Sequence, residues 1–298
     1  MSKSTDKNFK AVGKSLIFYL DSGSLYLKDK DSNQVNLTST IAEDIVCFDV
    51  SYDKSSSNIR IAIISMKDNK YSVYVTDTFK SKEFVWTSFS SDSKKWGKNS
   101  LNDTTLVIDR IIVNPNGVAV ATAPANKNAG YCYYDNKNWQ EYTLPENVTK
   151  IFTMTFGTVY TTDGLYLYYS VEQSNTLLFQ SFIDPQYGKT TTYRFDVSKN
   201  KIKELKSLMG HDGNSSLFAF WDKGVYLFTD PKNARKTILE PEADFLISDF
   251  CATLTAKTKS FFALENQDKQ YSKDKKTHYN LTYLSGVYPE FMVNAVLK

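Results

Sequence analysis

The chain has 298 residues, of which 41% are hydrophobic and 14% are aromatic. Its 36 Lys and Arg residues and 33 Asp and Glu residues leave a formal net charge of +3. This near-neutral balance, without a single basic face that carries aromatic residues, argues against nucleic-acid binding. No apolar run approaches the length of a transmembrane helix, so we expect no insertion into a membrane.

The sequence offers few residues for metal or cofactor chemistry. Cys47, Cys132 and Cys251 are widely spaced and each lies in an apolar run, which favours buried thiols over a disulfide framework. With only two histidines and no cluster of ligating residues, we expect no metal site. No glycine-rich phosphate loop is present, so we expect no nucleotide cofactor. The polar, basic N-terminus predicts a cytoplasmic protein or one exported without a classical signal peptide.

The first element in chain order is a hairpin-like phrase over residues 16–27. An aromatic-rich run is followed there by Asp, Gly and a Tyr-Leu strand, and the phrase returns at residues 159–167 and 217–227. Recurrence of this kind predicts a repeated antiparallel β unit. Residues 1–13, which precede it, are expected to be a flexible N-terminal segment.

Short apolar segments, bounded by polar residues and glycine, continue along the rest of the chain. Such segments at regular spacing are typical of many short strands. The strands that we predict for the next two units cover residues 44–50, 58–65, 71–77, 83–89, 106–113, 117–123, 130–134 and 139–144.

The second half is predicted to hold three further units. The first begins with a strand at residues 150–156, the second covers residues 193–239, and the third begins with a strand at residues 245–254. The segment 172–209 is ambiguous, because residues 201–208 fit a helical turn as well as a strand.

The predicted hairpin turns recur at a regular distance. They lie near Asp21, Asp68, Asn126, Asp163, Asp222 and Gln270, at intervals of about 50 residues, which matches four-stranded propeller blades. We therefore predict an all-β fold: one β-propeller domain over residues 14–298, with six blades, or five as the alternative. The C-terminal strand at residues 291–297 is expected to pair with the N-terminal strands and close the ring.

Catalysis has one candidate arrangement in such a fold. A propeller glycosidase needs two or three carboxylates that converge on the sugar. Asp49, Asp109 and Asp249 each lie in the first predicted strand of a unit, where they would face the central channel. An Asp at this position also commonly binds the backbone of a neighbouring blade, so the sequence leaves both roles open and favours a protein that is not an enzyme.

Aromatic residues suggest carbohydrate binding. Sugar rings have apolar faces that stack on aromatic side chains, and Trp86, Trp139 and Trp221 lie at predicted strand ends or beside turns. The structural alternative for each tryptophan is packing between blades.

Two stretches resemble the repeat of the fungal fucose-specific lectins. Residues 117–120 followed by 130–139, which include Tyr133 and Trp139, are similar to that repeat. Residues 58–63 are similar to another of its strands, with Arg60 at the sugar-binding arginine position. The resemblance implies a six-bladed propeller and a sugar site built from Arg, Glu and an aromatic residue. The chain departs from this pattern, because the glutamate position falls near Val73 in one unit and near Gly130 in the other.

From these observations we predict a non-enzymatic, lectin-like module that binds a glycan or glycoprotein between its blades. Arg60, Trp86, Tyr133, Trp139 and Trp221 are the candidate ligand-binding residues. A propeller that binds a protein partner and a propeller glycosidase are the alternatives, and a homo-oligomer is left open.

Overall fold

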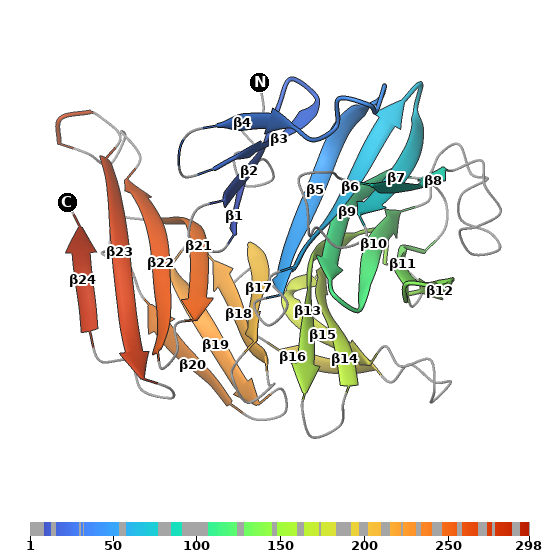
Figure 1. Cartoon of the computed structure of the whole chain (residues 1–298). Helices are drawn as coiled ribbons and strands as arrows, with labels where there is room; N and C mark the ends of the chain where they lie inside the picture. The colour runs from blue at the N-terminus through green and yellow to red at the C-terminus, as the bar shows by residue number, and fades with distance from the viewer. Residues whose placement is uncertain are drawn as a thin grey trace. The chain divides into compact units, whose positions relative to one another are not determined.

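The computed structural model describes most of the chain and divides it into two compact units, residues 1–151 and 152–298. Each unit is treated by itself below (Figure 1). The residues that the structure describes are 9–12, 16–29, 31, 33–53, 58–76, 85–90, 107–123, 128–144, 148–159, 164–172, 174–182, 192–196, 202–209, 215–221, 223–230, 234–239, 246–254, 258–267, 273–275, 278–287 and 293–297.

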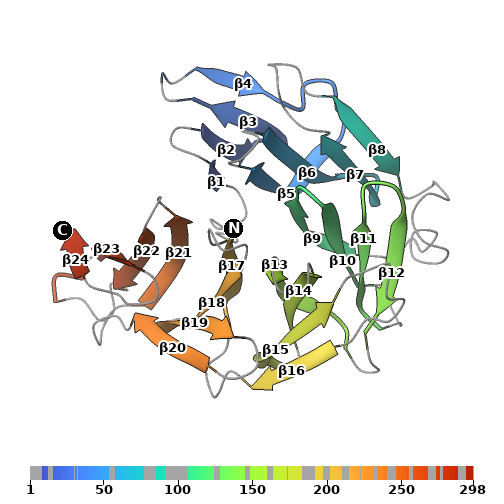
Figure 2. The same cartoon turned by 60° about the horizontal axis from the view of Figure 1, so that its bottom comes forward.

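The first unit holds three four-stranded antiparallel sheets, in each of which strands consecutive in the chain lie side by side (Figure 2). Two-residue turns join β2 to β3 and β6 to β7, and such hairpins place consecutive strands side by side. The first sheet contains β1 (Phe9–Val12), β2 (Leu16–Asp21), β3 (Ser24–Lys28) and β4 (Gln34–Asn36); the second β5 (Asp44–Asp53), β6 (Asn58–Lys67), β7 (Lys70–Thr76) and β8 (Trp86–Ser90); the third β9 (Val107–Asn114), β10 (Gly117–Ala123), β11 (Gly130–Tyr134) and β12 (Trp139–Thr143).

The second unit repeats the same order in three more four-stranded sheets. In its described residues the strands of the fourth sheet are β13 (Ile151–Val159), β14 (Gly164–Val171), β15 (Ser174–Phe182) and β16 (Thr192–Asp196); those of the fifth β17 (Glu204–Met209), β18 (Ser215–Trp221), β19 (Gly224–Asp230) and β20 (Ala234–Leu239); those of the sixth β21 (Leu246–Leu254), β22 (Thr258–Gln267), β23 (His278–Val287) and β24 (Val293–Leu297).

The all-β prediction is confirmed, and the described residues form no helix. None of them therefore builds a helix long and apolar enough to span a membrane.

Strand β6 shows how the sheets of the first unit are held together. Its residues from Ile59 to Ser65 are all buried, so both faces of the strand are covered. Side chains of a strand alternate between faces. Ile59, Ile61 and Ile63 accordingly pack with Phe18 and Leu25 of the first sheet.

The other face of β6 belongs to a second core. Ala62 and Ile64 pack with Val113 of β9 and Val118 of β10 in the third sheet. Cys47 and Cys132 are buried in the same core, as predicted for these two thiols. One strand thus supplies apolar side chains to two interfaces between sheets.

Two of the predicted turns fall on described residues, and both lie where expected. Asp21 and Asp68 lie at the hairpin turns that join the second and third strands of their sheets. Asp163, like Asn126, Asp222 and Gln270, lies outside the described residues, so the turn predicted there stays a prediction.

Two other expectations changed. Residues 204–209, within the ambiguous segment, form strand β17 rather than a helical turn, because they pair with β18 along the whole strand. The expected pairing between the N- and C-terminal strands stays a prediction. Phe9–Val12, expected in the flexible N-terminal segment, pairs with β2, while β24 pairs with β23. The pairing of β1 with β2 follows from their proximity along the chain, because only three residues separate the two strands. Closure into one ring and a single domain over residues 14–298 stay predictions.

The packing of β6 gives a direct test. Ile61 has no exposed surface and faces the first sheet. Ile61→Ala should lower the free energy of unfolding by about 2–5 kcal/mol, because it removes buried methylene groups and leaves a cavity. Denaturant unfolding measures this loss. Val85, which is 72% exposed, is the control: Val85→Ala should change stability by less than about 0.5 kcal/mol. Equal effects of the two variants would contradict the packing described.

Candidate functional site

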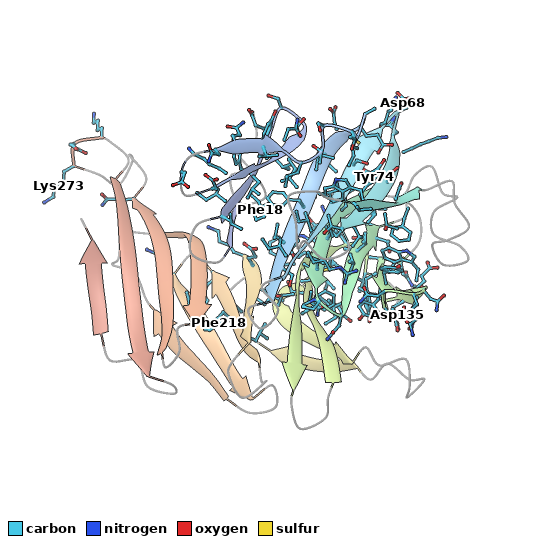
Figure 3. The ribbon with its side chains drawn as sticks, viewed as in Figure 1. Phe18, Asp68, Tyr74, Asp135, Phe218 and Lys273 are labelled. Atoms are coloured by element: carbon cyan, nitrogen blue, oxygen red, sulfur yellow. The ribbon has the colours of Figure 1, made fainter. Side chains whose placement is uncertain are left out.

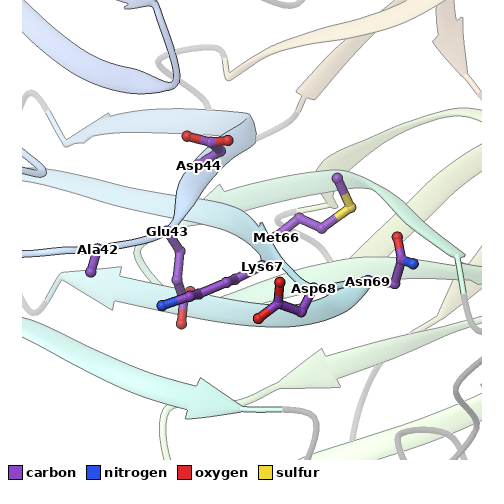
Figure 4. Close-up of a pocket in the computed structure, with 7 residues that line it drawn as sticks. All are labelled: Ala42, Glu43, Asp44, Met66, Lys67, Asp68 and Asn69. Carbon is purple, nitrogen blue, oxygen red and sulfur yellow. The ribbon is translucent and has the colours of Figure 1, made fainter.

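A polar pocket of about 340 Å³ lies at one end of the second sheet (Figure 4). One side is formed by residues 42–44, where β5 begins, and the other by residues 66–69, at the end of β6 and in the turn to β7. The seven lining residues are Ala42, Glu43, Asp44, Met66, Lys67, Asp68 and Asn69. Three carboxylates, one ammonium group and one amide therefore surround this space.

Glu43 is held in place on the sheet side of the pocket. The Ser65 hydroxyl, fully buried, donates a hydrogen bond to Oε2 of Glu43. Burial and the negative charge of Glu43 raise the pKa of Tyr74 above its ordinary value. Glu43 is therefore a pre-oriented acceptor, with Ser65 and Tyr74 beside it.

The turn between β6 and β7 forms the other side of the pocket. Asp68 and Asn69 have φ angles of 52° and 60°. Left-handed conformation at both central residues defines the two-residue turn that matches the twist of a hairpin, and Asp and Asn tolerate it better than most side chains. The turn thus places Asp68 at the tip of the hairpin (Figure 3).

The first sheet supports this end of β5. The backbone N–H of Ile45 donates to the carbonyl of Gly23 at 2.9 Å. Gly23 has a φ of 76°, and a Cβ added there would lie 2.6 Å from Oδ1 of Asp44. Another residue at this position would have a strained backbone and would displace the Asp44 carboxylate, so the glycine leaves room for an acidic residue of the pocket.

Two of the sequence-predicted ligand residues converge elsewhere, on the turn between β9 and β10. Arg60 extends from β6 and donates from Nη1 to the carbonyls of Asn114 and Pro115, at 3.1 and 3.3 Å. The Tyr133 hydroxyl donates to the carbonyl of Asn116 at 3.2 Å. Both side chains are buried, and burial followed by the charge of Asp135 raises the pKa of Tyr133, although the Arg60 charge opposes this shift.

The three tryptophans predicted to bind a ligand lie in separate places. Trp86 donates from Nε1 to the Leu37 carbonyl at 3.1 Å, which joins the second sheet to the first. Trp139 lies edge-on to Phe89 of the second sheet, at 5.3 Å between ring centroids. Trp221 is buried beside its own turn, where a Cβ on Gly224 would lie 2.3 Å from its ring. Each tryptophan therefore has a packing role, and ligand binding by these residues stays a prediction.

Of the acidic residues proposed for catalysis, Asp49 has a defined partner. Its Oδ2 accepts a hydrogen bond from the Val113 backbone N–H at 2.9 Å, between the second and third sheets. Asp109 and Asp249 lie on β9 and β21, and their side chains are outside the described residues. Within the described part of the chain, no group of three or more potential metal ligands is present.

Sequence reasoning identified the turn at Asp68 but not the pocket beside it. The residue types Asp-Asn signal a turn. Nothing in the sequence signals that residues 42–44 would face them across the sheet end, since that depends on the pairing of Asp44 with Met66.

Comparison with known proteins shows which fold this chain shares. No protein-family model and no curated protein matches the sequence. Among solved structures, a mutant of the Aleuria aurantia lectin in complex with alpha-methyl-L-fucoside is similar, with a TM-score of 0.51, 13% identity, and coverage of 97% of this chain and 93% of that one. A proposed 6-phosphogluconolactonase from Bacteroides uniformis has a TM-score of 0.53, 11% identity, and coverage of 97% and 80%.

A chain of the Mitotic Checkpoint Complex has a TM-score of 0.54, 10% identity, and coverage of 97% and 76%. Together with the repeated four-stranded sheets, these similarities decide the architecture. The chain has a β-propeller fold. Because the same propeller fold serves a lectin, a suggested enzyme and part of a protein complex, the fold alone does not select among these functions.

The Asp49 contact leads to a testable prediction on stability. Asp49→Ala should lower the free energy of unfolding by about 1–3 kcal/mol, because the Val113 N–H loses its acceptor in a partly buried site. Asp49→Asn keeps an oxygen acceptor and should lower the free energy of unfolding by clearly less than Asp49→Ala. Thermal or denaturant unfolding of the two variants checks this order, and a larger loss in Asp49→Asn would contradict it.

The raised pKa of Tyr133 predicts a dependence of stability on alkaline pH. Because the folded pKa lies above the unfolded value of about 10, the folded state retains the phenol proton at pH values where the unfolded state releases it. This contribution is complete below the unfolded pKa and is lost as pH rises toward the folded one. Stability of Tyr133→Phe should therefore fall less steeply above pH of about 10, as measured by urea unfolding across pH. Identical slopes for the two proteins would argue against this.

Proposed function

We propose that this protein is a non-enzymatic β-propeller that binds carbohydrate, and that the pocket of residues 42–44 and 66–69 is a ligand site. The observation that carries the proposal is the lining of that pocket. Glu43, Asp44 and Asp68 supply oxygen acceptors, while Lys67 and Asn69 supply donors. A sugar presents many hydroxyl groups, each both donor and acceptor, and needs such a mixed set of partners.

The geometry of the pocket suits recognition of such a ligand. Glu43 is held by Ser65, so its oxygen loses little freedom when it binds a hydroxyl group. Asp68 lies in a two-residue turn flanked by the paired residues Lys67 and Lys70, which likewise limits the entropy lost on binding. Hydrogen bonds to charged groups are stronger than those between neutral partners.

The resemblance to the fungal fucose-specific lectins makes fucosides the first probes. The Aleuria aurantia lectin, a structural neighbour, was solved with alpha-methyl-L-fucoside. Fucose recognition by this chain is part of the proposal, as is a second site at Arg60 and Tyr133, the two resemblance-derived residues that meet at one turn.

A glycan array with the full chain tests the proposal, followed by titration of the best ligand. Asp68→Gly should weaken binding by about tenfold or more, because it removes a charged acceptor. Glycine tolerates the left-handed backbone at this position, so the turn should persist. The matched control is Lys275→Gly, an exposed charged residue with a φ of 58° outside the pocket, which should bind as the wild type does.

Each alternative outcome has a distinct meaning. No binding across a broad array would overturn the proposal, and recovery of one stoichiometric protein partner that sugars do not displace would favour a protein-interaction propeller. Turnover of a chromogenic glycoside, lost in an Asn variant of Asp49, Asp109 or Asp249, would favour the glycosidase. Trp139→Ala is a weaker probe, because Trp139 also packs against the core.

A further inference from the structure

The turn between β9 and β10 contains the chain's single Asn-Gly dipeptide, Asn116-Gly117. The backbone nitrogen of a residue that follows asparagine can attack the side-chain amide carbon. The C–N bond to that side-chain nitrogen then breaks, ammonia leaves, and a cyclic succinimide forms. Glycine is the most permissive residue at the attacking position, because it has no Cβ to obstruct the ring closure.

Water completes the reaction by opening the succinimide at either carbonyl. One product is aspartate, and the other is isoaspartate, in which the main chain passes through the side chain and gains one methylene group. Asn116 is exposed, so solvent reaches the reacting group. The local sequence and the exposure therefore favour deamidation at this residue.

The structure opposes the first step. Oδ1 of Asn114 accepts hydrogen bonds from the backbone N–H groups of Asn116 and Gly117, both at 2.8 Å. The attacking nitrogen of Gly117 must lose its proton and turn toward the Asn116 side chain. In the folded protein that proton is donated to Asn114 instead, and Gly117 is buried.

Other side chains donate hydrogen bonds to the same turn. The carbonyl of Pro115 accepts from Arg60 of the second sheet and from Nδ2 of Asn136, and the carbonyl of Asn116 accepts from Tyr133. An additional backbone methylene at position 116 would move these carbonyls away from their donors. Isoaspartate there would thus weaken the contact between the second and third sheets.

We propose that Asn116 is a deamidation site held in check by Asn114, and that its conversion to isoaspartate loosens the contact between these two sheets. This proposal does not rest on carbohydrate binding at the pocket of residues 42–44 and 66–69. It assigns to the side chain of Asn114 a protective role beyond the shaping of a turn.

The test follows deamidation of Asn116 in the full chain at mildly alkaline pH, by peptide mapping with mass spectrometry. Enzymatic methylation of isoaspartate separates the two products. Asn114→Ala should accelerate the reaction in the folded protein by about tenfold, the factor that loss of one to two hydrogen bonds is worth. Asn114→Asp retains an oxygen acceptor and should react as slowly as the wild type.

Unfolding in urea provides the reference rate, and circular dichroism reports whether each variant is folded. The wild type should react much more slowly when folded than in urea, and this comparison holds even if Asn114→Ala fails to fold. Equal rates for the folded and unfolded wild type, or an unchanged rate in folded Asn114→Ala, would overturn the protective role. Aged wild type should unfold at lower urea than Asn116→Ala treated alike, since the variant cannot deamidate at position 116; equal midpoints would overturn the effect on the sheets.

Discussion

Burial of both faces of the second strand in a sheet is the constraint on which the first unit depends. In β6 the side chains that alternate along the strand enter two different cores, one shared with the first sheet and one with the third. A single four-stranded sheet would leave one of these faces in water. Each sheet therefore requires a neighbour, which is the physical basis of repetition in this fold.

The same alternation of side chains along a strand determines which neighbouring sheet the polar side chains contact. Arg60 shares the face of Ala62 and Ile64, so it extends toward the third sheet and bonds to the turn of β9 and β10. Trp86 packs with the opposite core and donates to the first sheet. These side chains bind backbone groups of a neighbouring sheet, whereas the pocket lies at a strand end, where the ladder stops and polar side chains line the space.

Local features were predictable and pairings between distant segments were less so. Short apolar runs, together with turn residues such as Asp68-Asn69, identified most strands and their hairpins, because these features depend on neighbours in the chain. The pocket was missed because Glu43 and Asp68 are far apart in the sequence, and only the register of β5 and β6 brings them to one end.

The recurring Asp-Gly phrase separates what the sequence determined from what the tertiary structure decided. Its recurrence was enough to predict an all-β repeat with hairpins, because turn chemistry and two-residue alternation are local properties. The role of its glycine was decided by the surroundings. Gly23 is needed for its left-handed φ and for the nearby Asp44, whereas Gly224 is needed because the Trp221 ring occupies the space of a Cβ. The sequence contains the same residue at both places, but steric demand arises from the atoms that folding brings beside it.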